Sequence, residues 1–104
     1  SASEIRALLE ETQSLALTNQ VSHRVGFDAN DHSLLIERKQ SGSYAILQKR
    51  PVEEEMTLEA TRWPSFGPFG FAQSGTILLD SPEFQTSIVV SSVGRIRQTD
   101  LLKK

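Results

Sequence analysis

The spacing of the apolar residues changes from a helical to a strand period near residue 20, and this change constrains the fold most. Over the first twenty residues, apolar side chains recur at three- and four-residue intervals and polar residues occupy the other side. This stripe consists of Ile5, Leu8, Leu9, Thr12, Leu15 and Ala16. From Val21 to Phe27 the pattern alternates instead, as in a strand with one buried face. The sequence therefore predicts an amphipathic helix over about residues 2–20, followed directly by a strand.

Short strand patterns separated by turn residues continue as far as residue 98. The stretch 53–62 alternates and is expected to be a strand, although its three glutamates also suit a helix start. Residues 63–75 contain too many Gly and Pro for one regular element, so a loop pinned by buried aromatic rings and holding a short strand near 69–72 is expected. The other expected strands are 34–38, 44–49, 76–79, 86–91 and 95–98.

These elements predict an α+β fold in one domain, because a chain of 104 residues supports a single core. The helix should pack across an antiparallel sheet that begins at residue 21, with a second β-rich portion over 69–98 and a basic tail over 99–104. The residues expected in the core are Ile5, Leu8, Leu15, Val25, Phe27, Leu34, Ile36, Ile46, Phe71, Ile77, Leu79, Ile88, Val90 and Ile96.

Composition excludes several classes of protein. The chain has no cysteine, which excludes disulfides, cysteine zinc sites and thiol catalysis. It is 38% hydrophobic and 23% charged, which is too apolar for a disordered chain and too polar for a membrane bundle. The net charge of −2 gives the whole protein no cationic field. The last ten residues nevertheless hold four basic residues against one acid, so this end forms a basic patch.

No arrangement of residues typical of catalysis or metal binding is present. His23 and His32 lie on different elements without metal-ligand spacing, so they are interpreted as a strand-edge and a turn residue. The acids at 53–55 are typical of a solvated face. The glycines of 67–75 lack the lysine and helix of a phosphate loop, and Ser74 lacks a nucleophile elbow. We therefore expect no enzyme, no cofactor and no metal site.

The segment Gly94-Arg95-Ile96-Arg97 is the strongest candidate for a binding site. On a strand, Arg95 and Arg97 project to the same face ~7 Å apart while Ile96 points to the core. That interval is close to the phosphate repeat of one nucleic-acid strand, and Lys103 and Lys104 would extend the patch if the tail folds back. Composition alone favours another interpretation, an edge strand whose charges prevent edge-to-edge pairing.

The order of these elements resembles the soluble part of a type IV pilin-like minor pseudopilin of the GspH/FimT family. The matching segments are the helix ending at 15–19, the strand 21–27, the segments 69–71 and 75–79, and the closing 88–97, which ends in Gly-Arg-Ile-Arg. The family begins with a leader, a prepilin peptidase and methylation site, and an apolar membrane helix. We expect this chain to start after the membrane half of that helix.

The resemblance implies a protein anchored in the inner or cytoplasmic membrane, with its globular domain periplasmic or extracellular. Its partners would be other minor and major pilins or pseudopilins in a short filament, and without the apolar helix the domain should be mostly monomeric. Two roles stay open. One is a type IV pilus or competence component that contacts DNA during uptake through Arg95, Arg97, Lys103 and Lys104. The other is a purely structural role in type II protein secretion, without DNA binding.

Overall fold

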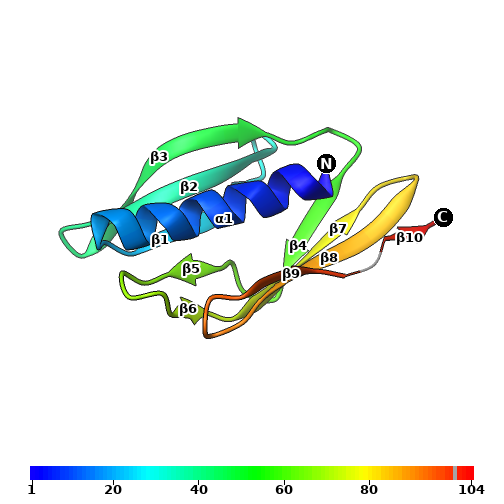
Figure 1. The fold of residues 1–104 in the computed structure, drawn as a ribbon. Coiled ribbons are helices and arrows are strands. Elements are labelled where there is room, and N and C mark those ends of the chain that lie inside the picture. The colour runs from blue at the N-terminus through cyan, green and yellow to red at the C-terminus, as the bar shows by residue number, and fades with distance from the viewer. Residues whose placement is uncertain (100) are drawn as a thin grey trace.

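The structure, a computed structural model, describes residues 1–99 and 101–104 and contains one helix followed by ten short strands within them (Figure 1). The helix is α1 (Ala2–Asn19), and the first five strands are β1 (His23–Asp28), β2 (Ser33–Gln40), β3 (Ser43–Pro51), β4 (Thr57–Ala60) and β5 (Ser65–Phe66). The remaining strands are β6 (Ala72–Gln73), β7 (Gly75–Asp80), β8 (Phe84–Val90), β9 (Ile96–Gln98) and β10 (Leu102–Lys103).

Helix α1 is the predicted amphipathic helix. Its first turn is closed by a capping box, in which Ser1 and Glu4 each bond the other's backbone N–H. It ends at Gln20, whose backbone is left-handed with φ 54°. The buried face consists of Ala2, Ile5, Leu8, Leu9, Thr12 and Ala16, while Leu15 is half-buried. In the part of the chain that the structure describes, no helix has the length and apolar content needed to cross a membrane.

The first sheet has the strand order β3-β2-β1-β5-β6. Its β2–β3 hairpin contains a register shift, because Ile36 lies opposite Gln48 whereas the next residue, Glu37, lies opposite Ile46. Because the bulge adds one residue to β3, the side chains on the two sides of the bulge alternate in opposite phase relative to the faces of the sheet. Ile46 therefore shares the solvent side with Glu37 and is 52% exposed, so its predicted place in the core is wrong.

The second sheet has the order β10-β8-β7-β4, and β9 also pairs with β8. Strands β9 and β10 follow one another along the edge of β8 that β7 leaves free. The predicted division at residue 69 is wrong in detail, since β4 joins this second sheet and β5 and β6 join the first. The expected tail also differs, because Leu102–Lys103 returns to pair with β8; Asp100, within that tail, lies outside the described residues.

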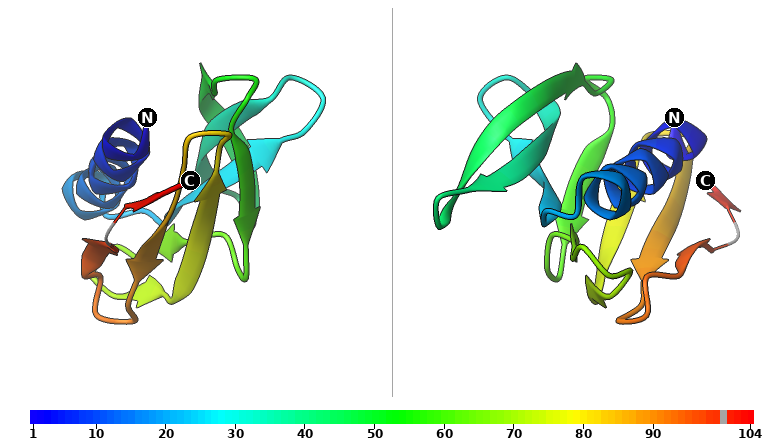
Figure 2. Two further views of the ribbon diagram at one scale, coloured as in Figure 1. Left: turned by 90° about the vertical axis from the view of Figure 1, so that its right-hand side faces the viewer. Right: turned by 60° about the vertical axis from the view of Figure 1, so that its left-hand side comes forward.

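The helix lies over one face of both sheets and contacts β1, β5 and β9, which places the core between α1 and the two sheets (Figure 2). Nine of the predicted core residues are fully buried. Leu15, Phe27 and Ile96 pack against the core from partly buried positions. Phe71 is 68% exposed just before β6, where its carbonyl accepts from the Gly67 N–H, so its predicted burial is wrong. The other buried residues of the core are Ala2, Leu9, Ala16, Met56, Leu58 and Phe66.

Candidate nucleic-acid interface

The turn between β8 and β9 positions the two arginines of the predicted site. The Gly94 N–H donates to the Ser91 carbonyl at 2.9 Å, and the Ser91 N–H donates to the Arg95 carbonyl at 3.0 Å. Gly94 is buried with φ +83°, and a Cβ there would overlap the Gly70 carbonyl oxygen. Only glycine combines that backbone conformation with so close an approach. The glycine of Gly-Arg-Ile-Arg therefore holds the turn against the neighbouring loop.

Arg95 and Arg97 are both exposed, and Ile96 between them packs against the core, as predicted. Arg97 lies opposite Val89, which faces away from the helix because its neighbours on β8 are buried. Both arginines line a shallow groove of about 300 Å³ on this outer face, together with Val89, Ser91 and Val93. The structure thus brings the two guanidinium groups into one groove.

Lys103 and Lys104 do not join this groove. Lys103 lies opposite Phe84, at the other end of β8 from Val89, which is five residues or ~17 Å along the strand. Phe84 packs against the core, so Lys103 lies on the helix side of the sheet rather than on the outer face. Lys104 forms an ion pair with Asp80. The predicted group of four basic residues is therefore divided into two pairs.

A third arginine that sequence reasoning did not single out lies beside the arginine groove. Arg62 is exposed and lines a neighbouring groove of about 500 Å³. The two grooves share Val89 and Ser91, so they are continuous across the end of β8. In the sequence, Arg62 comes at the end of a segment whose secondary structure was ambiguous. Its place beside the arginine groove follows from the hydrogen bond between residues 61 and 76, which the sequence pattern does not indicate.

Exposed apolar side chains gather at the same end of the molecule. They are Leu17, Phe69, Phe71 and Val93, which are 46%, 79%, 68% and 68% exposed and are named the apolar end below. The loops that carry them touch, since the Ala72 N–H donates to the Ser92 carbonyl at 2.9 Å and a Cβ at Gly70 would lie 3.8 Å from Leu17 Cδ2. In Figure 1 these loops and the C-terminal end of α1 lie on the left, opposite both termini.

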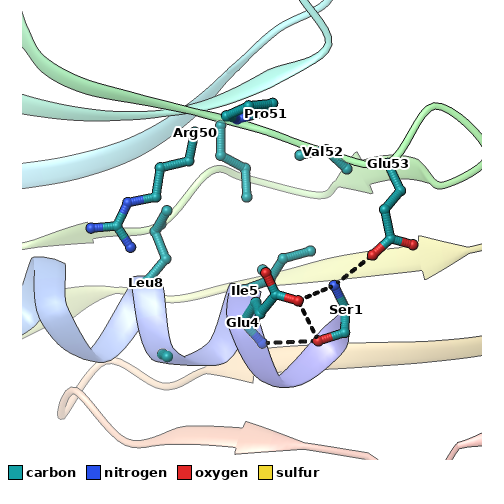
Figure 3. Close-up of a pocket in the computed structure, with 10 residues that line it drawn as sticks. Ser1, Glu4, Ile5, Leu8, Arg50, Pro51, Val52 and Glu53 are labelled. Carbon is teal, nitrogen blue, oxygen red and sulfur yellow. Dashed lines mark hydrogen bonds and ion pairs between the residues drawn. The ribbon is translucent and has the colours of Figure 1, made fainter.

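A cleft of about 250 Å³ separates the first turns of α1 from the end of β3 (Figure 3). Glu4 and Glu53 lie on either side of Ser1, with their Oε1 atoms 3.2 Å and 3.1 Å from its nitrogen. Ser1, Glu4 and Glu53 therefore hold the first turn of α1 against the segment after β3. The acids at 53–55 are exposed, as expected.

Both imidazoles bond main-chain carbonyls instead of facing each other across a site. His23 is fully buried and its Nδ1 donates to the Val21 carbonyl at 2.7 Å, so it lies in the core rather than at the edge. His32 Nε2 donates to the Glu53 carbonyl at 2.9 Å. Within residues 1–99 and 101–104, no three His, Asp or Glu side chains form a group that could hold a metal ion.

The outer face of the first sheet has a hollow of about 410 Å³ whose polar groups are also paired. Arg24 Nε donates to Glu37 Oε1 at 2.9 Å, and its guanidinium lies 4.0 Å from the centre of the Tyr44 ring. Phe27 stacks on Trp63 at the same hollow, with ring centres 6.1 Å apart. These contacts explain the hollow as packing between charged and aromatic side chains.

Solved structures share this fold over nearly the whole chain. The type IV minor pilin FimU of Pseudomonas aeruginosa superposes with a TM-score of 0.77 at 19% identity, covering 95% of this chain and 85% of FimU. The minor pseudopilin EpsH from the type 2 secretion system of Vibrio cholerae gives 0.79 at 13% identity, covering 94% and 92%. No family model and no curated protein sequence matches the chain. The fold is therefore that of minor pilins and pseudopilins, which confirms the predicted α+β class.

Proposed function

We propose that this domain is the globular part of a minor pilin or pseudopilin, a structural subunit of a type IV pilus or type II secretion filament. The shared fold with FimU and EpsH supports this role. The observation that carries it is the apolar end, where four large apolar side chains from three separate segments stay exposed. Exposed apolar clusters of this kind mark sites of contact with other proteins. The role is assembly, without a catalytic step.

In this proposal the apolar end contacts another pilin-type subunit. The N-terminal end of α1 lies on the opposite side of the molecule (Figure 1), so an apolar anchoring segment joined there would leave the apolar end free. The sequence resemblance is the basis for such an anchor in the inner or cytoplasmic membrane, with the domain on its periplasmic or extracellular side. Axial stacking of subunits would then bury Phe69 and Phe71 between neighbours.

Photo-crosslinking in the organism of origin tests the subunit contact. The full-length gene product would carry p-benzoyl-L-phenylalanine in place of Phe69, or in place of Leu47 as the control. Leu47 is a suitable control because it is 44% exposed but lies on β3, at the opposite edge of the first sheet from β5 and β6, which flank Phe69 and Phe71. We expect an adduct with another pilin or pseudopilin from position 69 and none from position 47. Adducts of equal yield from both positions, or none from position 69, would overturn the proposed contact.

We propose DNA contact as a second function, supported by the groove that holds Arg95 and Arg97. Both guanidinium groups are exposed, and no described residue forms an ion pair with either of them. Two phosphate contacts give weak binding that is indifferent to base sequence, in the range of roughly 10⁻⁴ to 10⁻⁶ M. This would suit a pilus or competence component that takes up DNA.

A titration of the domain with a short DNA duplex at 50 mM salt decides between the two roles. Binding that perturbs the Arg95 and Arg97 side-chain NMR resonances supports DNA contact. A domain that leaves the duplex unbound at several hundred micromolar protein has only the structural role, as in a type II secretion pseudopilin.

A further inference from the structure

Arg62 and a set of hydroxyl groups extend the arginine groove across the second sheet, and we infer that the phosphate backbone of bound DNA follows this path. The inference rests on the proposed DNA contact and names further residues for it. The path consists of Arg97 and Arg95 at one end, Arg62 at the other, and the side chains of Thr61, Ser74, Thr76, Ser91 and Ser92 between them. We call these five side chains the hydroxyl row.

Pairing of the strands fixes the order of these residues. Arg97 lies opposite Val89 on β8, and Val89 lies opposite Thr76 on β7. Thr76 is bonded in turn to Thr61, since the Thr61 N–H donates to the Thr76 carbonyl at 3.1 Å. Three strand spacings of ~4.8 Å separate Arg97 from residue 61, a span of ~14 Å. Arg62 follows residue 61 directly, so it lies at the far side of this span from the arginine pair on β9.

The hydroxyl row can donate to phosphate oxygens. Thr61 Oγ1 accepts a hydrogen bond from the Thr76 N–H at 3.1 Å, and Ser91 Oγ accepts one from the Arg95 N–H at 3.1 Å. Each of these bonds uses a lone pair and leaves the O–H group as a donor. Serine and threonine hydroxyls commonly contact the nucleic-acid backbone in this way. The row therefore supplies neutral donors between the cationic ends.

Charge distinguishes these two grooves from the other hollows of the protein. Among the described residues, no carboxylate lines either of them, whereas Glu4 and Glu53 line the cleft beside α1 and Glu37 lines the hollow of the first sheet. This path is thus locally cationic on a protein whose net charge is −2. Electrostatic repulsion between a polyanion and the acidic rest of the surface would confine the polyanion to this path.

A groove that follows one strand and then crosses the sheet favours a thread-like polyanion over a flat anionic membrane. The path runs along β9 from Arg95 to Arg97 and then across β8 and β7 to the segment that carries Arg62. Its apolar lining consists of valines, of which Val93 at the edge is 68% exposed. Binding to a vesicle would instead draw on the lysines and arginines of a broad surface. Vesicles of phosphatidylglycerol and phosphatidylcholine are therefore the comparison ligand in the test.

The test compares single and double variants of the domain for binding to a 20-base-pair duplex between 20 and 150 mM NaCl. Three phosphate contacts predict a slope of log K against log salt of about −2.7 for the wild type. Arg62→Gln should weaken binding by about five- to tenfold at 50 mM salt and bring the slope to about −1.8. Lys39→Gln is the matched control, because it removes one exposed positive charge from the other sheet.

The outcomes distinguish failure of the extended path from failure of the proposed DNA contact itself. If Arg62→Gln and Lys39→Gln bind alike while Arg95→Gln/Arg97→Gln loses binding, the extended path is wrong and the arginine pair alone binds DNA. If the wild type binds no duplex, or binds only the anionic vesicles, both proposals fail. A melting temperature of Arg62→Gln within about 2 °C of the wild type verifies that the variant is folded.

Discussion

The side-chain amide of Gln13 donates a 2.6 Å hydrogen bond to the carbonyl of Gly94, joining the middle of α1 to the turn that precedes the two arginines. The two residues are 81 positions apart in the sequence. On its other side, Gly94 lies against the backbone of Gly70. The helix, the β5–β6 loop and the β8–β9 turn therefore meet at one residue, which couples the apolar end to the arginine groove.

Replacing Gly94 with alanine should destabilise the domain more than the same change at Gly42. Both glycines have a positive φ, of +83° and +85°, which costs about 1–2 kcal/mol for alanine. Gly42 has open space around its Cβ position, whereas a Cβ at Gly94 would overlap the Gly70 carbonyl and lie 2.6 Å from Gln13 Nε2. Urea unfolding should give a loss of about 1–2 kcal/mol for Gly42→Ala and at least about 3 kcal/mol for Gly94→Ala. Equal losses would show that the contact with Gly70 is unimportant.

Truncation of single leucines on α1 should distinguish a buried position from an exposed one. Leu9 is 0% exposed in the core and Leu17 is 46% exposed at the apolar end. Leu9→Ala should cost about 3 kcal/mol, because the fold cannot fully close the resulting cavity. Leu17→Ala should cost less than about 1 kcal/mol. Urea unfolding of both variants measures this difference, and a Leu17→Ala loss as large as that of Leu9→Ala would contradict the placement of the helix.

The turn after β1 carries a pH-dependent ion pair. Lys49 Nζ lies 3.2 Å from Asp28 Oδ2, and hydrogen bonds from Lys49 and from the backbone N–H groups of Asp31 and Asn30 lower the pKa of Asp28. A lowered pKa in the folded state stabilises the fold above the ordinary aspartate pKa of about 3.9, and this stabilisation is lost as the pH falls through the folded value.

Lys49→Gln should therefore raise the pKa of Asp28 toward its ordinary value. An NMR titration of the Asp28 carboxyl carbon measures the change directly. Lys39→Gln serves as the control and should leave the Asp28 pKa where it is, because Lys39 lies at the opposite end of the hairpin. An unchanged pKa in Lys49→Gln would mean that the backbone N–H groups alone set it.

Local periodicity predicted those features that depend on neighbours in the chain. The helix and the alternation that puts Arg95 and Arg97 on one face follow from spacings of two to four residues, and both are confirmed. Ile46 has the same local pattern, but the bulge beside Ile36 reverses its face. A bulge depends on the partner strand, so alternation within β3 alone could not reveal it.

Long-range pairing determined the parts of the site that the sequence did not predict. Lys103 is separated from Arg97 because β10 pairs with the beginning of β8 and β9 with its end. Arg62 enters the site because residue 61 bonds residue 76. Phe71 was expected inside because aromatic rings usually pin such loops, but Phe66 of the same region is the buried ring, with 1% exposure against 68% for Phe71. Each of these outcomes depends on register, which hydropathy does not encode over such short strands.

The division of the basic residues predicts different effects for two double variants of equal charge. Arg95→Gln/Arg97→Gln and Lys103→Gln/Lys104→Gln each remove two positive charges, but only the first pair lies in the groove. The arginine variant should lose most of its duplex binding at 50 mM salt, and its slope of log K against log salt should be less steep by about 1.8. The affinity of the lysine variant should stay within about threefold of the wild-type value. Loss of the exposed Lys104–Asp80 ion pair should cost at most about 1 kcal/mol, so both variants remain folded.

Fluorescence anisotropy with a labelled duplex measures both affinities. If both variants weakened duplex binding equally, the affinity would depend on the total charge of the domain, and the groove would not be the binding site.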